Sequence, residues 1–234
     1  MKTSSETPQF TDSSLQRHAL SGETMGTRYS AVFFSAAGLD ESAIGASLFA
    51  SVDKVDQQMS TWKPDSDLNR LNAMPEQQWI AVPEELLTVL DTALSISLQS
   101  HGAFDIGVGD LVNAWGFGPV GSEPDDSAVS ALKERAYRCA NEALEIDHAH
   151  RRVRKRGEIT LDLSGIAKGY GVDALAHCLD RFGFTSYLVG IDGEMRAKGL
   201  KPDGRAWAVA IEKTVRHVRE VRGVLELTDA AKIG

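Results

Sequence analysis

The sequence predicts an α+β fold in which mixed sheets pack against helices. Some segments place apolar residues at helical spacing, and others alternate apolar with polar residues as half-buried strands do. Clusters of Gly, Pro and Asp separate these segments. The two kinds of segment do not alternate regularly, so a doubly wound parallel sheet is not favoured.

Each element is predicted from local signals. The helices follow from apolar residues every three or four positions, from a capping break at 64–67 and from Pro83, which can open a helix. In chain order they cover residues 41–58, 68–71, 83–98, 110–115, 130–139 and 165–182. The strands follow from alternation between turn residues. They cover residues 27–34, 79–82, 144–147, the region of 153, 159–163, 186–191, 207–212 and 223–227. A loop is expected over 116–127.

The segment around Asp162 carries the strongest functional signal. Apolar and polar residues alternate over 159–163, and the period then changes to that of a helix. We expect Ser164 to cap this helix and Gly183 to end it. The first N–H groups of a helix lack partners and attract anions, phosphate above all. Because a carboxylate repels a bare phosphate, Asp162 indicates a metal, a ribose or a ring N–H nearby; the alternative is a second cap.

The same segment carries a family resemblance. Asp162-Leu-Ser-Gly-Ile-Ala-Lys-Gly-Tyr170 resembles the central motif of the FAD:protein FMN transferase family, also called the ApbE family. Further blocks match in the family's order, at residues 24–29, 59–72, 102–119, 187–194 and 207–212. The match covers roughly residues 21–230, and several ordered blocks are far more specific than any one of them.

The resemblance implies a fold and an activity. The fold is ApbE-like, and the activity is Mg²⁺-dependent transfer of FMN from FAD to a Thr or Ser hydroxyl of a partner protein, with release of AMP. FAD is then a substrate, and Mg²⁺ neutralises phosphate charge. The implied acceptor is a membrane-associated electron-transfer subunit.

The resemblance also implies site residues. The nucleotide-contacting positions are Met25, Trp62, Ala103, Phe104, Asp105, Asp162 and Lys168, and the metal-contacting position is Gly165. Trp62 replaces the family's usual Tyr and keeps an aromatic face. Asp105 could accept a hydrogen bond from the adenine amino group, or could cap a turn or helix. Lys168 could offset phosphate charge, or be a solvated helix residue. Gly165 can offer Mg²⁺ only its backbone carbonyl, and no catalytic residue is assigned.

The sequence departs from the family at its end. After a segment like 225–234, family members continue into a Thr-Ser-Gly-Asp-Tyr-Arg block, a His-x-Ile-Asp-Pro motif and an Asp-rich metal segment. We therefore expect a C-terminally incomplete form: a truncated form, a fragment, a split gene or a degenerate paralogue. A non-catalytic flavin-binding module, a pyrophosphatase that hydrolyses FAD to FMN and AMP, and an α+β domain without a ligand remain alternatives.

Composition limits the function classes. The 234 residues carry a formal net charge of −8, which disfavours nucleic-acid binding. The basic run 151–156 is expected to form a solvated hairpin turn beside the acidic segment 141–147, with contact to anionic lipid as a minor option. Cys139 and Cys178 do not have the spacing of a metal site, so a structural role is expected.

The organisation along the chain is expected to be simple. Residues 1–20 are predicted to be a flexible N-terminal segment, and residues 21–234 a partial ApbE-like domain. Family members are often exported and membrane-anchored, facing the periplasm. This chain shows no apolar signal segment and no lipid-bearing Cys, so a cytoplasmic protein or a processed form both fit.

Overall fold

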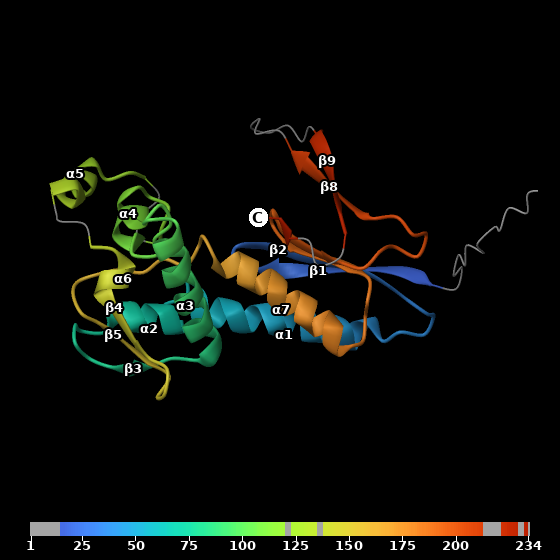
Figure 1. The fold of residues 1–234 in the computed structure, drawn as a ribbon, viewed down its shortest axis with the longest axis horizontal. Helices are drawn as coiled ribbons and strands as arrows, with labels where there is room; N and C mark the ends of the chain where they lie inside the picture. Colours follow the sequence, from blue (N-terminus) through green and yellow to red (C-terminus); the bar gives the residue numbers. More distant parts are fainter. Residues whose placement is uncertain (1–14, 120–122, 135–137, 213–220, 229–231, 234) are drawn as a thin grey trace, which may run out of the picture. The chain divides into compact units, whose positions relative to one another are not determined.

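The computed structural model describes residues 15–119, 123–134, 138–212, 221–228 and 232–233. The chain forms two compact units. Unit 1 comprises Met1–Phe49 and Val172–Gly234, and unit 2 comprises Ala50–Gly171. The chain passes from unit 1 into unit 2 within helix α1 (Glu41–Met59) and returns within helix α7 (Ala167–Arg181) (Figure 1).

Unit 1 is built on a five-stranded antiparallel sheet. The order of its strands is β1 (Gln16–Thr24), β2 (Thr27–Ser35), β6 (Tyr187–Ile191), β7 (Glu194–Lys198) and β10 (Lys232–Ile233). Strand β2 pairs with β6 although they are far apart in sequence, with Tyr29 opposite Ile191 and Phe33 opposite Tyr187. The sheet therefore forms only when the N-terminal strands β1 and β2 and the later strands β6 and β7 are both present.

Alternation along the central strands buries one face of this sheet. Phe33 on β2 and Tyr187 and Val189 on β6 are buried, because side chains two residues apart point to the same face. Helix α7 packs there, and its Asp180 accepts hydrogen bonds from the Tyr187 hydroxyl and the Lys198 ammonium, at 2.9 and 2.8 Å. This contact fixes the C-terminal half of α7 on β6 and β7.

Helix α7 ends as predicted. Gly183 adopts a left-handed backbone with φ of 83°. Its N–H donates to the Asp180 carbonyl, and the N–H of Phe184 donates to the Leu179 carbonyl. These two bonds form a Schellman motif, which glycine enters without a steric penalty.

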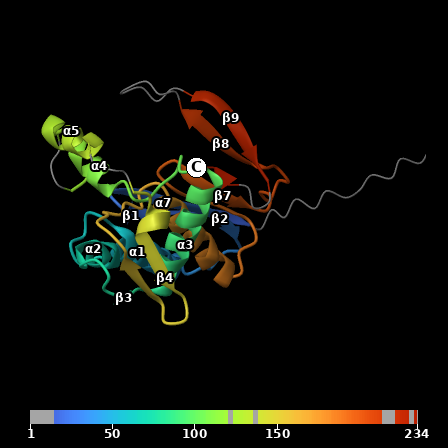
Figure 2. The same ribbon diagram turned by 60° about the vertical axis from the view of Figure 1, so that its left-hand side comes forward.

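A separate antiparallel pair, β8 (Trp207–Glu212) and β9 (Val221–Leu227), completes unit 1. Figure 2 shows the two strands side by side in red. Trp207 and Leu227 form a buried cluster with Ala197 of β7, and the ring of Phe34 lies 5.8 Å from that of Trp207. The contacts of Trp207 and Leu227 thus attach this strand pair to the five-stranded sheet.

Unit 2 combines helices with a small sheet. The helices are α2 (Asp67–Ala73), α3 (Glu84–Gln99), α4 (Gly109–Ala114), α5 (Asp126–Glu134) and α6 (Ala140–Ala143). The sheet has the order β3 (Ile80–Ala81), β5 (Arg152–Lys155) and β4 (Leu144–Asp147). Apolar side chains from α2, α3 and the segment 158–163 form the core; among them are Leu68, Leu71, Leu86, Leu90 and Leu161.

The basic run 151–156 lies mainly on strand β5 of the β4–β5 hairpin and is not itself the turn. Arg154 and Arg156 form ion pairs with Glu145 on β4, and Arg152 pairs with Asp147. Three of the five basic residues of the run therefore pair with the two carboxylates of the strand beside it.

The α+β prediction is confirmed by this mixture of helices and antiparallel sheets. The prediction of a strand at 159–163 is wrong, because that segment is extended but belongs to none of the sheets formed by the described residues. Residues 16–20, expected to be flexible, form part of β1. The expected helix 130–139 is displaced toward the N-terminus, since α5 covers Asp126–Glu134, and residues 135–137 lie outside the described residues.

Across the described part of the chain, no helix has both the length and the apolar character needed to cross a membrane.

Candidate functional site

The segment 158–163 in unit 2 is held by backbone and side-chain groups on two sides. The N–H of Asp162 donates to the Ile106 carbonyl at 2.8 Å, and the N–H of Gly109 donates to the Thr160 carbonyl at 2.9 Å. On the other side, the Asn72 side-chain amide bonds both the N–H and the carbonyl of Leu161, at 2.9 and 3.0 Å. The segment therefore places Asp162 beside the block that contains Asp105.

Close approach explains the glycines of that block. A Cβ at Gly107 would lie 2.7 Å from Ile159 Cδ1, and one at Gly109 would lie 2.7 Å from Thr160 Cγ2 and 2.8 Å from the Thr160 carbonyl oxygen. Real Cβ atoms do not approach so closely, so these positions require glycine for the two segments to touch. Packing against residues 159 and 160 is therefore sufficient to explain the two glycines.

Asp162 is itself part of the turn that leads into α7. Its carboxylate accepts the N–H of Ser164 at 2.8 Å, and its side chain is 7% exposed. Ser164 lies in the turn 164–166, before the first helical residue, Ala167, so the prediction of Ser164 as the helix cap is wrong. Asp162 fulfils a turn-stabilising role of the kind that Asx residues have.

Two other predicted residues lie against one another in this region. The ring of Phe104 faces Gly165, where an added Cβ would stand 3.1 Å from Phe104 Cε2. The N–H of Phe104 donates to Ser100 Oγ at 3.1 Å, which fixes the backbone after α3. Ala103 precedes it and is exposed, and Lys168 lies in the first turn of α7.

The carboxylate of Asp105 stabilises the local backbone. Its Oδ1 accepts the N–H of Gly107 at 2.7 Å, and both oxygens lie 3.2 Å from the N–H of Ala140, the first residue of α6. This is the capping role considered above as the alternative to contact with adenine. Lone pairs remain on both oxygens, and the nucleotide contact stays a prediction.

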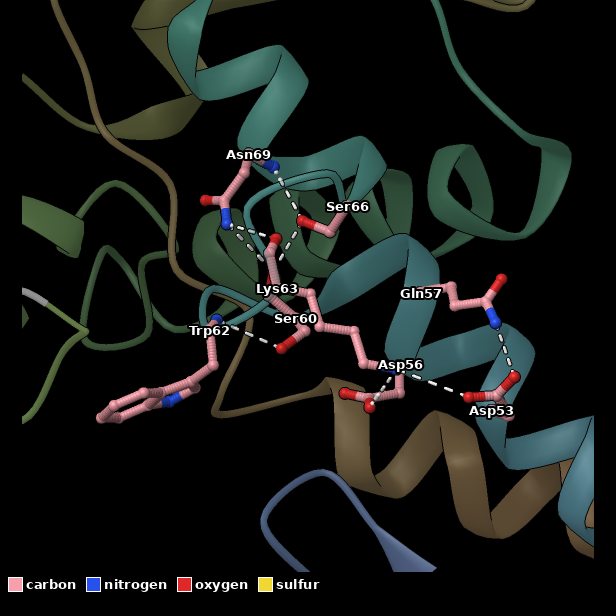
Figure 3. Close-up of polar contacts among 8 residues, drawn as sticks. All are labelled: Asp53, Asp56, Gln57, Ser60, Trp62, Lys63, Ser66 and Asn69. Carbon is pink, nitrogen blue, oxygen red and sulfur yellow. Dashed lines mark hydrogen bonds and ion pairs between the residues drawn. The ribbon is translucent and has the colours of Figure 1, made fainter.

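Trp62 projects from a loop whose backbone is extensively hydrogen-bonded (Figure 3). Trp62 is 65% exposed, and its backbone N–H donates to Ser60 Oγ at 3.1 Å. Ser66 Oγ donates to the Ser60 carbonyl at 2.6 Å and accepts the N–H of Asn69 at 3.1 Å, so Ser66 is both the N-cap of α2 and a support of this loop. An exposed aromatic on an ordered loop is a ready surface for a flat ring.

An ion-pair cluster connects the same loop to α1. Lys63 Nζ lies 2.7 Å from Asp56 and 3.4 Å from Asp53 (Figure 3). The hydrogen bond to Asp56, followed by that to Asp53, raises the pKa of Lys63 against the opposing effect of burial. The loop after α1 is therefore anchored at its lysine as well as at its carbonyls.

Met25 belongs to unit 1, in the two-residue turn between β1 and β2. Met25 and Gly26 both have positive φ, 47° and 70°, and Thr24 pairs with Thr27. This is the geometry of a type I′ hairpin turn, in which Asn and Gly are the usual residues. The neighbouring Thr24 Oγ1 is buried and has no hydrogen-bond partner among the residues that the structure describes. A methionine in this conformation is a local strain of the kind found at functional sites.

Unit 2 thus brings together four of the predicted residues, Phe104, Asp105, Asp162 and Gly165, in adjacent segments. Trp62 is connected to them through α2, and Lys168 follows within one turn of α7. The contacts that each residue makes with a nucleotide remain predictions.

The described residues offer few ligands for a bound metal ion. The described residues gather no group of three or more His, Cys, Asp or Glu side chains that could hold a metal ion. Gly165 offers a backbone carbonyl alone, whereas Mg²⁺ requires a near-octahedral set of oxygens. The described residues therefore do not by themselves fit a magnesium site.

Sequence reasoning missed the polar residues that support the site. Asn69, Asn72, Ser66 and Lys155 were not singled out, although the first three lie in a matched block. Lys155 is 7% exposed, and its Nζ donates to the Asn72 backbone carbonyl at 2.5 Å. Burial lowers the pKa of Lys155. The available signal was the spacing of two asparagines on one short helix.

Comparison with known proteins shows the family of the chain. The model of the family described as "ApbE family" matches residues 25–233. A FAD:protein FMN transferase of Vibrio cholerae is 37% identical over 213 residues, which is 91% of this chain and 64% of that relative. One of Klebsiella pneumoniae is 33% identical over 89% of this chain and 60% of its own length. The chain thus spans about three fifths of the length of the curated relatives it matches.

Solved structures show the same fold. The flavin transferase ApbE from Vibrio cholerae superposes with a TM-score of 0.81 at 37% identity, over 92% of this chain and 70% of that one. The ApbE protein from Thermotoga maritima superposes with a TM-score of 0.79 at 22% identity, which supports the fold alone.

Proposed function

This chain belongs to the ApbE family, and from that premise we propose that it is the flavin-nucleotide-binding part of an enzyme that transfers FMN from FAD to a protein. The observation that carries the proposal is the grouping of Phe104, Asp105, Asp162 and Gly165 in unit 2. The first three match the family's nucleotide-contacting positions, and Gly165 matches its metal-contacting position. Relatives named FAD:protein FMN transferase supply the reaction class.

The proposed roles follow from the chemistry of FAD, which has a flat tricyclic ring, an adenine and a pyrophosphate. Trp62 provides an exposed aromatic face for stacking, and Phe104 provides an apolar wall. Asp162 accepts hydrogen bonds from N–H or O–H groups of the nucleotide, and Lys168 compensates the phosphate charge at the start of α7. In unit 1, Met25 supplies a flavin contact from the β1–β2 turn.

For the whole enzyme we propose a single displacement at phosphorus. A Thr or Ser hydroxyl oxygen of the acceptor protein forms a new bond to the phosphorus of the FMN half. The pyrophosphate bond to AMP breaks, AMP leaves with the bridging oxygen, and the hydroxyl proton passes to solvent or base. Catalysis of such a step rests on positioning and charge stabilisation.

Magnesium dependence is part of the same proposal, because family members use it. Gly165 can give its carbonyl, and the remaining ligands must come from phosphate oxygens, water or residues beyond those described. We further propose a membrane-associated electron-transfer subunit as the acceptor.

The proposal is tested by FAD binding, measured as quenching of flavin fluorescence. We expect Trp62→Ala to weaken binding about tenfold, since base–aromatic stacking contributes about 1–3 kcal/mol. Trp62→Tyr should retain most of the affinity. Phe49→Ala, which removes an aromatic side chain of α1 that is 49% exposed, is the matched control and should change nothing. A parent chain that binds no FAD would disprove the proposal.

A second candidate is a flavin-binding module without chemistry, which the absence of a metal cluster among the described residues favours. Incubation with FAD, Mg²⁺ and an acceptor peptide separates the candidates. A peptide that gains the mass of FMN supports transfer. AMP released without an acceptor supports hydrolysis, and binding without either product supports the module.

A further inference from the structure

Helix α2 (Asp67–Ala73) carries two asparagines with related environments. Asn69 and Asn72 are three residues apart, so their side chains leave the helix on the same side. Both side-chain amides bond backbone groups of other segments. The helix is short, exposed on its other side at Arg70, and buried at Leu68 and Leu71.

Asn69 holds the loop that presents Trp62. Its Nδ2 lies 2.9 Å from the Thr61 carbonyl. The same nitrogen lies 2.8 Å from the Lys63 carbonyl and 3.4 Å from that of Ser60 (Figure 3). These carbonyls belong to residues on both sides of Trp62. An amide with two N–H donors that faces three carbonyls leaves this loop little freedom to rotate.

Asn72 holds the segment that contains Asp162. Its Oδ1 accepts the N–H of Leu161 and its Nδ2 donates to the carbonyl of the same residue. One side chain thus replaces the neighbouring strand that this extended segment lacks. Leu161 directly precedes Asp162, so this pairing sets where the backbone of Asp162 lies relative to α2.

Lys155 supports the end of the same helix. Its buried Nζ donates to the backbone carbonyl of Asn72, a group that has no partner within the helix because α2 ends at Ala73. The orientation of the Asn72 side chain therefore depends on a helix end that is itself fixed.

We propose that Asn69 and Asn72 are positioning residues, through which α2 holds the Trp62 loop and the Asp162 segment in one fixed arrangement for a flavin nucleotide. We call Asn69 and Asn72, with the backbone groups that they bond, the clamp. The ligand class rests on the proposed function, whereas the clamp itself does not. Preorganisation of this kind raises affinity because the ordering cost is met before the ligand binds.

The clamp is tested first without ligand, in the full chain, by amide hydrogen exchange. Asn72→Ala should speed exchange of the Leu161 and Asp162 amides at least tenfold. Asn69→Ala should do the same for Trp62 and Ser66, whose N–H groups donate to Ser60 Oγ and the Lys63 carbonyl. Arg70→Ala, which removes an exposed ion pair with Asp67 on the same helix, is the control and should leave all four amides unchanged.

The second test measures FAD affinity in double-mutant cycles, at a temperature where circular dichroism shows every variant folded. Each asparagine variant should bind FAD about tenfold more weakly, because it removes the support of a residue that contacts the ligand. Trp62→Ala should then cost much less in the Asn69→Ala background, and Asp162→Asn much less in the Asn72→Ala background. The crossed pairs, Asn69 with Asp162 and Asn72 with Trp62, should be closer to additive.

The outcomes separate the two ideas. Unchanged exchange at these amides, or additive cycles throughout, would overturn the clamp even if the parent binds FAD. Faster exchange in a parent that binds no FAD would support the clamp and remove the proposed function. If an alanine variant does not fold, Asn69→Asp and Asn72→Asp replace it, because they keep the side-chain shape and lose the amide donors.

Discussion

The ring of Phe104 lies against the backbone of Gly165, so that a Cβ on this glycine would stand 3.1 Å from Phe104 Cε2. The two residues are about sixty positions apart and belong to separate motifs of the sequence. Their contact explains in steric terms why the turn before α7 contains glycine, independently of any metal contact by its carbonyl.

Gly165→Ala should therefore displace Phe104 by a few tenths of an ångström. We expect FAD affinity to fall several-fold and stability to fall by about 1 kcal/mol, as mild overpacking does. The control is Gly169→Ala in α7, where an added Cβ meets nothing within 4 Å. That variant should gain about 0.5–1 kcal/mol from helix propensity and bind FAD normally. Equal affinities for the two variants would contradict the steric account; denaturant unfolding and flavin quenching measure both quantities.

Met25→Gly should separate stability from binding. Glycine relieves the left-handed conformation at this turn position, where φ is 47°, and its greater freedom when unfolded offsets part of the gain. We expect stability within about 1 kcal/mol of the parent and FAD affinity lowered about tenfold, as for loss of one good contact. Arg151→Gly, at an exposed turn residue with φ of 48°, should leave affinity unchanged. If Met25→Gly binds FAD like the parent, Met25 makes no ligand contact.

Gly183→Ala should destabilise unit 1 through the backbone alone. An added Cβ there meets no atom within 4 Å, but φ is 83°, which costs an L-residue about 1–2 kcal/mol. Gly193→Ala is the matched control, because it also meets nothing and has no left-handed φ. Thermal unfolding should show a lower midpoint only for Gly183→Ala, and a similar loss in both would point to a cause other than the helix end.

Asp147→Asn should lower stability in a pH-dependent way. The hydrogen bond from His150, followed by that from Arg152, lowers the pKa of Asp147 to about 2 in the folded protein. A carboxyl with a depressed folded pKa stabilises the fold fully above its usual value of 3.8, and that contribution disappears as the pH falls toward 2. Urea unfolding of both proteins should thus show a difference at pH 6 that shrinks between pH 4 and pH 2. A difference that stays constant over this range would contradict the depressed pKa.

Many helices and strands were predicted correctly because periodicity and capping residues are signals within the element itself. Strand β2 and helices α1 and α3 have their predicted type within two residues at each end, and β4 has its predicted bounds. Each has strong periodicity or a clear capping residue. Strand β7 was missed although Glu194–Lys198 alternates polar with apolar residues, because Gly193-Glu194 indicates a turn and the strand begins directly at that turn.

The segment 159–163 shows what local sequence patterns do not predict. Its alternation is real, since Ile159, Leu161 and Leu163 are buried, but its backbone partners are Ile106, Gly109 and the side chain of Asn72. Periodicity reports which face is buried and not which group accepts each hydrogen bond. For the same reason the sequence indicated Asp105 as polar and important, without showing that α6 and Gly107 use its carboxylate.

The order of the two units along the chain bears on how the protein is made. Everything that unit 2 needs has left the ribosome once residue 171 has emerged, whereas strand β2 must wait for β6, whose Tyr187 pairs with Phe33. During synthesis the nascent β1–β2 hairpin therefore keeps an apolar face and a strand edge uncovered while the inserted unit folds. Such an interval exposes newly made chains to misassociation, and a chaperone that covers this hairpin would raise their yield.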